Sequence, residues 1–234
     1  MDIVQRALQW LLILATPAAL TLASVRVVAQ PWFIDFEYRR ADFPPDLYGF
    51  TQEDRQAYGY FALEYLLYAK EVAYLSERAF PDGAPLFNAR ELRHMEDVQA
   101  ATQGAFAAHA ALLAAMAAVA AYLAWSPARR PALKRALFGG GMLTLGLLLA
   151  LLALVLLNWN HFFDLFHQLF FESGTWRFYV DDTLIRLYPE QFWFDAALAV
   201  GALTALGAAL LVIVGRWWQP RAGRTASRGE LSHT

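Results

Sequence analysis

Two histidines, His94 and His167, carry the groups best suited to chemistry in this sequence. A neutral imidazole exchanges a proton readily near neutral pH because its unperturbed pKa is about 6.5. Glu91 and Asp97 stand three residues before and after His94, and Asp164 stands three residues before His167. On a helix, such a carboxylate can fix one ring nitrogen and leave the other free, which is typical of an oriented general base. Polar groups that only cap helix ends at a membrane surface explain the same spacing.

Other reactive groups are scarce. The chain has no cysteine, which excludes disulfides, thiolate metal sites and a cysteine nucleophile. It has neither an HExxH run nor a GxSxG elbow, so we expect no metal, no cofactor and no serine nucleophile. Arg93 and Arg186 could hold a phosphate or polarise a carbonyl, although arginines of this kind more often form surface ion pairs. The net charge of -2 gives no indication of a nucleic-acid partner.

The composition predicts an all-α membrane protein, since 58% of the residues are apolar and only 17% are charged. A helix needs about 20 apolar residues to cross a hydrocarbon core of about 30 Å. Arg26, near the end of the first such stretch, is expected to reach toward the lipid headgroups. The four predicted transmembrane helices lie at 1–30, 102–125, 137–158 and 194–217.

Basic residues predict the orientation of these spans. Lysines and arginines concentrate in the turn 126–136 and in the tail 218–234, which the positive-inside rule assigns to the cytoplasm. Both termini are therefore expected inside. The segments 31–101 and 159–193 are expected on the outer face of the membrane.

The first outer segment is expected to form a small, mainly helical cap together with the outer end of the second span. Thr51 with Asp54, and Asn88 with Glu91, have the spacing of capping boxes, so helices are predicted to begin at 52 and 89. Nothing between 89 and 125 breaks the second of these helices. One or two short strands are expected, near 33–38 and 183–188.

The position of the histidines follows from folding the second and third spans into a hairpin. His94 and His167 are equally far in sequence from the turn at Arg130 and Pro131. If the third span continues as a helix through NHFFDLFHQLFF, both histidines stand level, about 50 Å from the turn and near the outer headgroups. His109 and His161 have no partner at their own heights.

Several motifs resemble the lipoprotein intramolecular transacylases, a family of bacterial integral membrane proteins. The strings YGFTQEDR, PLFNARELRHMEDV, FDLFHQLFFESGTW and DTLIRLYPEQFWFD occur in this order around the four spans. The resemblance implies transfer of the sn-2 acyl chain of a diacylglyceryl lipoprotein to the α-amino group of its N-terminal cysteine, which gives a lyso-form lipoprotein. It also implies that His94 and His167 are the functional pair.

The resemblance further implies a bacterial cytoplasmic membrane location, an active site on the outer face, and contact with membrane lipids. We assign His94 as the base, because Glu91 and Asp97 are available to orient it, and His167 as the group that assists the ester oxygen. The reverse assignment stays open. Two alternatives to this activity also stay open: another membrane acyltransferase or lipid hydrolase that uses the same pair, and a non-enzymatic membrane protein with a pH-sensitive outer cap.

Overall fold

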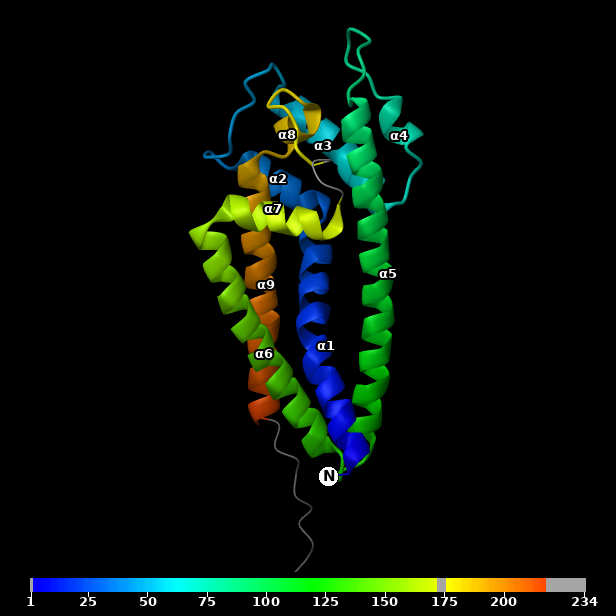
Figure 1. Cartoon of the computed structure of the whole chain (residues 1–234), viewed down its shortest axis with the longest axis vertical. Helices are drawn as coiled ribbons and strands as arrows, with labels where there is room; N and C mark the ends of the chain where they lie inside the picture. The colour runs from blue at the N-terminus through cyan, green and yellow to red at the C-terminus, as the bar shows by residue number, and fades with distance from the viewer. Residues whose placement is uncertain (1, 172–175, 218–234) are drawn as a thin grey trace, which may run out of the picture.

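Four long helices form the body of the molecule. The computed structural model describes residues 2–171 and 176–217, so the predicted cytoplasmic tail 218–234 lies outside the described residues. Each long helix is apolar enough to cross a membrane, and together they run along the long axis of the molecule (Figure 1). The prediction of an all-α membrane protein with four spans is confirmed. The four are α1 (Ile3–Val28), α5 (Ala89–Trp125), α6 (Arg130–Leu157) and α9 (Glu190–Trp217).

Small residues bring three of these helices close together. A β-carbon on Gly140 of α6 would lie 2.5 Å from Oγ1 of Thr16 in α1. A β-carbon on Gly141 would lie 2.6 Å from the backbone oxygen of Ala208 in α9. The glycine run of the third span is therefore a packing surface, since only glycine lets the backbones approach this closely.

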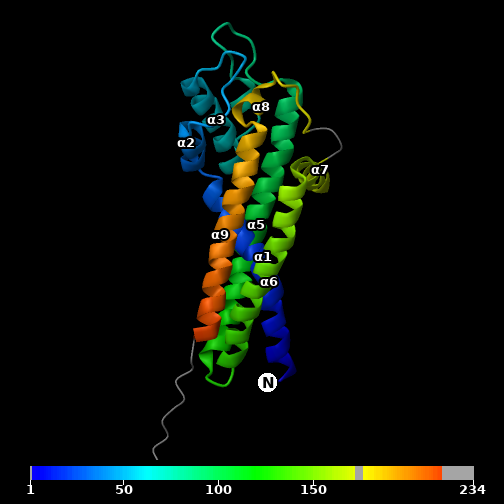
Figure 2. The same ribbon diagram turned by 90° about the vertical axis from the view of Figure 1, so that its left-hand side faces the viewer.

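A cap of short helices covers one end of the bundle (Figure 2). Two capping boxes fix where its helices begin, as the sequence predicted. Thr51 and Asp54 exchange hydrogen bonds at the start of α3, and Asn88 and Glu91 do so at the start of α5. The cap core is apolar and includes Tyr65, which is 1% exposed. The cap helices are α2 (Pro31–Arg39), α3 (Gln52–Leu67), α4 (Ala73–Ser76) and α8 (Thr183–Leu187).

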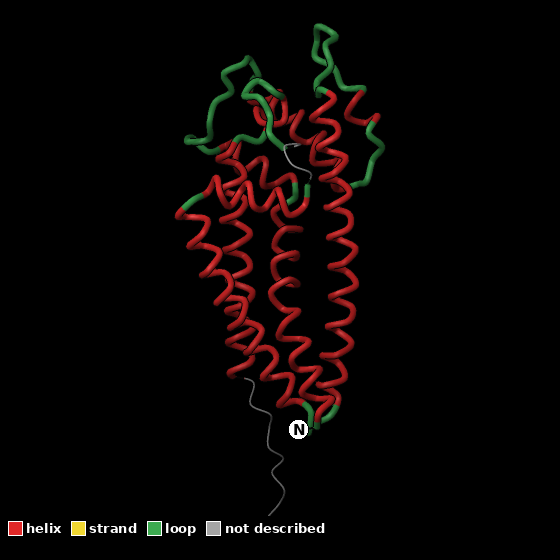
Figure 3. Tube along the Cα trace, viewed as in Figure 1, coloured by secondary structure: helices red, strands yellow, loops and turns green. Residues whose placement is uncertain are grey.

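The two predicted strands are helices instead. Residues 33–38 fall in α2 and residues 183–188 overlap α8, and the trace shows no strand among the described residues (Figure 3). In α2 the buried side chains recur at helical spacing, and Pro31 at the first helical position favours a helix start. In α8 the buried Leu184 and Leu187 are three residues apart. Within the described residues, β pairing is limited to one bridge between Ala79 and Pro85.

The third span does not continue straight to His167, which corrects the simple hairpin. Helix α6 ends at Leu157, and α7 (Trp159–Phe170) begins after a break at Asn158. The Asn158 side chain accepts a hydrogen bond from the His161 backbone N–H at 3.0 Å, so it caps a new helix. Figure 1 shows α7 lying across the bundle below the cap, with α1 between α5 and α6.

Candidate active site

His94 lies on the second turn of α5, at the end of that helix that enters the cap. Helix α5 has 37 residues and is about 55 Å long, whereas about 20 residues cross a hydrocarbon core. Because α5 ends at Trp125, next to the turn that joins it to α6, its surplus length projects on the cap side. The His94 side chain is 9% exposed, and its Nδ1 atom is buried without a hydrogen-bond partner.

His167 lies in the last turn of α7. Its Nδ1 lies 2.7 Å from the backbone oxygen of Phe163, one helical turn earlier. A carbonyl oxygen can only accept, so this contact places the proton on Nδ1 of the neutral ring. The lone pair of Nε2 is then left free, and no described residue binds it. His167 therefore has the orientation of a general base.

The two imidazole rings face one another within a box of aromatic rings. Their centroids are 6.5 Å apart and their planes differ by 25°, so they are nearly parallel. No hydrogen bond joins them, which leaves both rings available to one reacting group. The Phe171 ring contacts both histidines, at centroid distances of 5.4 Å from His94 and 5.7 Å from His167. Phe178 packs edge-on against His94 at 5.2 Å, and Trp176 lies 5.5 Å from His167.

Asp182 attaches the segment that carries these last two rings to the start of α5. Its carboxylate accepts from the Tyr179 backbone N–H at 2.7 Å and from the Asn88 side chain at 2.8 Å, and it pairs with Arg90. The Arg90 guanidinium also stacks on the Tyr179 ring at 4.5 Å. Residues 176–182 are thereby held against the helix that bears His94.

Burial controls the protonation of both histidines. Desolvation, with a smaller contribution from His167, lowers the pKa of His94 from 6.5 to about 4. Desolvation also lowers the pKa of His167, but there the hydrogen bond to Phe163 and the charge of Asp164 oppose the shift. Both rings are therefore neutral at pH 7, and of the two only His167 has partners that oppose the lowering of its pKa.

The carboxylates that the sequence offered as orienting groups have other partners. The Glu91 oxygens accept backbone N–H bonds from Asn88 at 2.8 Å and from Leu184 at 2.6 Å, so Glu91 joins α5 to α8. Asp164 pairs with Arg177 at 3.2 Å. Asp97 is exposed and makes no hydrogen bond to a described residue. None of the three hydrogen bonds to an imidazole in the described structure, so the orienting hydrogen bonds expected from the sequence are not formed there, although the charge of Asp164 still acts on His167.

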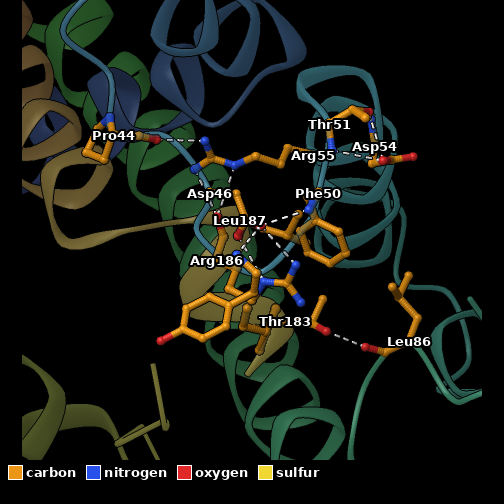
Figure 4. A network of polar contacts seen from close by, with 12 residues as sticks. Pro44, Asp46, Phe50, Thr51, Asp54, Arg55, Leu86, Thr183, Arg186 and Leu187 are labelled. Carbon is orange, nitrogen blue, oxygen red and sulfur yellow. Dashed lines mark hydrogen bonds and ion pairs between the residues drawn. The ribbon is translucent and has the colours of Figure 1, made fainter. Parts of the chain in front are cut away.

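The two candidate arginines, Arg93 and Arg186, make no hydrogen bond or ring contact with either histidine in the described part of the chain. Arg186 forms a two-pronged pair with Asp46, at 2.9 and 3.0 Å, and lies 3.4 Å above the Phe50 ring (Figure 4). Its neighbour Arg55 donates to the backbone oxygens of Arg186 and Pro44. Arg93 is exposed and has no ion pair among the described residues. Arg186 and Arg55 thus fasten the cap loops to each other.

The remaining histidines are outside the pair. His161 is exposed on α7. His109 is 2% exposed and joins α5 to α1: its Nδ1 accepts from Arg26 at 3.1 Å, and its Nε2 lies 3.0 Å from the Ala19 oxygen. The guanidinium of Arg26, which was expected to reach toward the headgroups, is bound to α5 through His109 and the Phe106 oxygen.

Sequence reasoning missed the groups that actually contact the histidines. The Phe163 carbonyl was detectable, since His167 follows it by four residues on a helix. Phe178 and Trp176 were not, because their approach depends on Asp182 reaching a helix more than 80 residues away. Aromatic residues near a membrane surface are too common for their spacing to identify a site.

Fold and site together define an α-helical integral membrane protein with a histidine pair, one ring buried and the other half-buried, where its cap meets the bundle. The chain belongs to the lipoprotein intramolecular transacylase family, whose model, described as "Lipoprotein intramolecular transacylase Lit", matches residues 9–193. The family is one of acyltransferases by its name, and its name refers to lipoprotein substrates.

Similar proteins agree with this membership. An uncharacterized protein of Aquifex aeolicus (strain VF5) is 31% identical over 192 residues, which cover 82% of this chain and 85% of that protein. The lipoprotein intramolecular transacylase Lit from Bacillus cereus has the same fold, with a TM-score of 0.75 and 22% identity, over 92% of this chain and 95% of that one. A Bacillus cereus variant in which a histidine is replaced by alanine matches with a TM-score of 0.67 and 20% identity, over 92% and 93% of the two chains.

Proposed function

We propose that this protein transfers the sn-2 acyl chain of a diacylglyceryl lipoprotein to the α-amino group of the lipoprotein's own N-terminal cysteine. The observation that carries the proposal is the pair of neutral histidines, 6.5 Å apart in an aromatic box, one of which has a free lone pair. Family membership supplies the kind of substrate. The product is an amide and a free glyceryl hydroxyl, and no water is consumed.

In this proposal His167 is the base, which reverses the assignment made from the sequence. The amino nitrogen attacks the ester carbonyl carbon, and Nε2 of His167 removes a proton from that nitrogen as the C–N bond forms. The resulting imidazolium is stabilised by its Nδ1–H bond to the Phe163 oxygen and by the nearby charge of Asp164. The same proton then passes to the glyceryl oxygen as the C–O bond breaks.

His94 serves as a hydrogen-bond donor to the ester oxygen. Its low pKa keeps it neutral, and a neutral imidazole carries one N–H that can stabilise the negative charge developing on the carbonyl oxygen. Being buried among Phe171 and Phe178, it works where charge is poorly screened by water. A protonated His94 would leave His167 less able to accept a proton, because the two rings face each other.

The aromatic box suits an intramolecular reaction. The nucleophile and the ester belong to one substrate, so the enzyme needs to hold them together rather than form an acyl intermediate. Apolar walls exclude water, which would otherwise hydrolyse the ester. This accounts for acyl transfer by a chain that has no cysteine and no serine elbow.

We place the site on the outer face of the bacterial cytoplasmic membrane. The basic turn that joins α5 to α6 lies at the opposite end of the bundle from the cap, and positively charged turns stay in the cytoplasm. The histidine pair then stands near the outer headgroups, where a lipoprotein anchored by its acyl chains presents its glyceryl esters.

Mass spectrometry of a reporter lipoprotein tests the proposal. Cells that express this protein should convert the diacylglyceryl form to an isomer of unchanged total mass, whose N-terminal fragment carries one acyl chain in an amide. Unchanged reporter in the presence of well-expressed protein would refute the transfer. Release of free fatty acid, with a loss of mass, would indicate a hydrolase instead.

A further inference from the structure

Two tryptophan N–H groups are buried without an acceptor in the described part of the chain, and one of them lies beside the histidine pair. These are Nε1 of Trp159 and Nε1 of Trp176. The indole N–H only donates, and a buried donor normally has a partner, so each exception needs an explanation. Trp176 is 6% exposed and lies against the His167 ring in a tilted arrangement, with centroids 5.5 Å apart and 31° between the planes.

We propose that the Trp176 indole N–H binds the substrate's ester carbonyl oxygen and, with His94, forms a two-donor oxyanion site. The proposal rests on the proposed function and extends it with a further catalytic residue. Two observations carry it. First, Nδ1 of His94, like Nε1 of Trp176, is a buried ring nitrogen without a hydrogen-bond partner. Second, the rings of both residues lie next to the ring of His167.

The surroundings of Trp176 leave the substrate as the natural acceptor. Its ring neighbour is the His167 imidazole, whose Nδ1–H is already bound to Phe163 and whose Nε2 makes no hydrogen bond to the indole. The ester carbonyl is the one strong acceptor that the reaction brings next to His167. When the amine attacks, this oxygen becomes negatively charged, and a donor already in place stabilises the charge without reorganising.

The closed state of the box gives the proposal a consequence for binding. Both unpaired nitrogens are shut off from solvent in the free chain, so a substrate reaches them only when the groups that cover them move apart. The bonds that these donors make strengthen when the amine attacks and the carbonyl oxygen becomes negatively charged. Trp176 is expected to act mainly on the rate of transfer and less on the concentration of lipoprotein that half-saturates the enzyme.

The test replaces Trp176 with phenylalanine, which keeps an aromatic ring and removes the N–H. Trp159→Phe is the matched control, because Trp159 also buries an unpaired N–H but packs on Phe162, Phe163 and Phe194 and on neither histidine. Single-turnover rates are measured with purified protein in phospholipid nanodiscs that contain a diacylglyceryl lipopeptide. We expect the Trp176→Phe rate to fall by about 10- to 100-fold with half-saturation changed less than threefold, and Trp159→Phe to match wild type.

To separate the N–H from ring shape, Trp176 is also replaced by benzothienylalanine, which retains the bicyclic ring and exchanges the N–H for sulfur. This isostere should be as slow as Trp176→Phe while unfolding at the wild-type temperature. Wild-type rates in the isostere would overturn the proposal, as would an equal loss in Trp159→Phe or a loss confined to half-saturation. If the wild-type protein itself transfers no acyl chain, the proposed function fails. If the wild type and the isostere transfer it equally fast, only the role of the Trp176 N–H fails.

Discussion

Replacing Glu91 with glutamine separates a structural role for this residue from a catalytic one. Glu91 is 1% exposed, and each of its oxygens accepts one backbone N–H, from Asn88 at 2.8 Å and from Leu184 at 2.6 Å. An amide has a single oxygen, so in Glu91→Gln one of these N–H groups must face an NH₂ donor. The variant therefore loses one bond and keeps the other, while the side chain keeps its size.

The size of the effect follows from these two contacts. A hydrogen bond to a charged group contributes about 1.5–3 kcal/mol, so Glu91→Gln, which loses one bond, should lose that amount, and Glu91→Ala, which removes both bonds, about 3–6 kcal/mol. In a chain of this length, 1 kcal/mol corresponds to roughly 2–4 °C in unfolding temperature. The glutamine variant should thus unfold roughly 3–12 °C below wild type.

The assay compares the unfolding temperature of purified protein in one detergent with the single-turnover transfer rate well below that temperature. Glu96→Gln, an exposed change on the same helix, is the control for loss of one charge. The folded Glu91→Gln protein should keep a rate within about threefold of wild type. An unchanged unfolding temperature combined with a large loss of rate would refute this reasoning and return Glu91 to the role of orienting His94.

Three further predictions follow from other contacts. Burial lowers the pKa of His94 from 6.5 to about 4, so as the pH falls the ring takes up a proton in the unfolded chain before it does so in the folded chain. The free energy of unfolding should therefore fall between pH 6.5 and pH 4. The decrease due to His94 alone is about 3 kcal/mol, measured as the difference in acid unfolding between wild type and His94→Gln, and equal pH profiles would contradict it. Gly141→Val should destabilise the bundle by several kcal/mol, because its side chain would enter the backbone of Ala208, whereas Gly104→Val, at an open position, should not; thermal unfolding of both variants decides. His109→Leu should lower the unfolding temperature by leaving Arg26 without its side-chain acceptor, while the folded fraction keeps its transfer rate; loss of that rate at a normal unfolding temperature would contradict the structural role.

The sequence predicted those features that depend on local spacing. Capping pairs such as Thr51 with Asp54 fix helix starts through neighbouring atoms, and the apolar windows reflect the membrane directly. The spacing also predicted that His94 and His167 stand level, although the path of the chain to His167 is different. The chain breaks at Asn158 and α7 returns across the bundle to bring His167 to α5, whereas the prediction assumed one straight helix.

Long-range contacts explain what the sequence could not reveal. Glu91 stands one turn from His94 and was a reasonable orienting group, but Leu184, more than 90 residues later, takes its free oxygen. With that carboxylate engaged, the base assignment moves to His167, whose ring is oriented by a backbone oxygen. Tertiary partners of this kind compete for a side chain in ways that its sequence neighbours do not indicate.

The most direct test of the account compares transfer rates of His167→Gln and His94→Gln, with the exposed His161→Gln as control. Loss of the base should slow single-turnover transfer by about 10²–10⁴-fold, and loss of the His94 donor by about 10²–10³-fold. His161→Gln should transfer at the wild-type rate. A folded His167→Gln protein that transfers the acyl chain at the wild-type rate would contradict the central claim that this imidazole is the base.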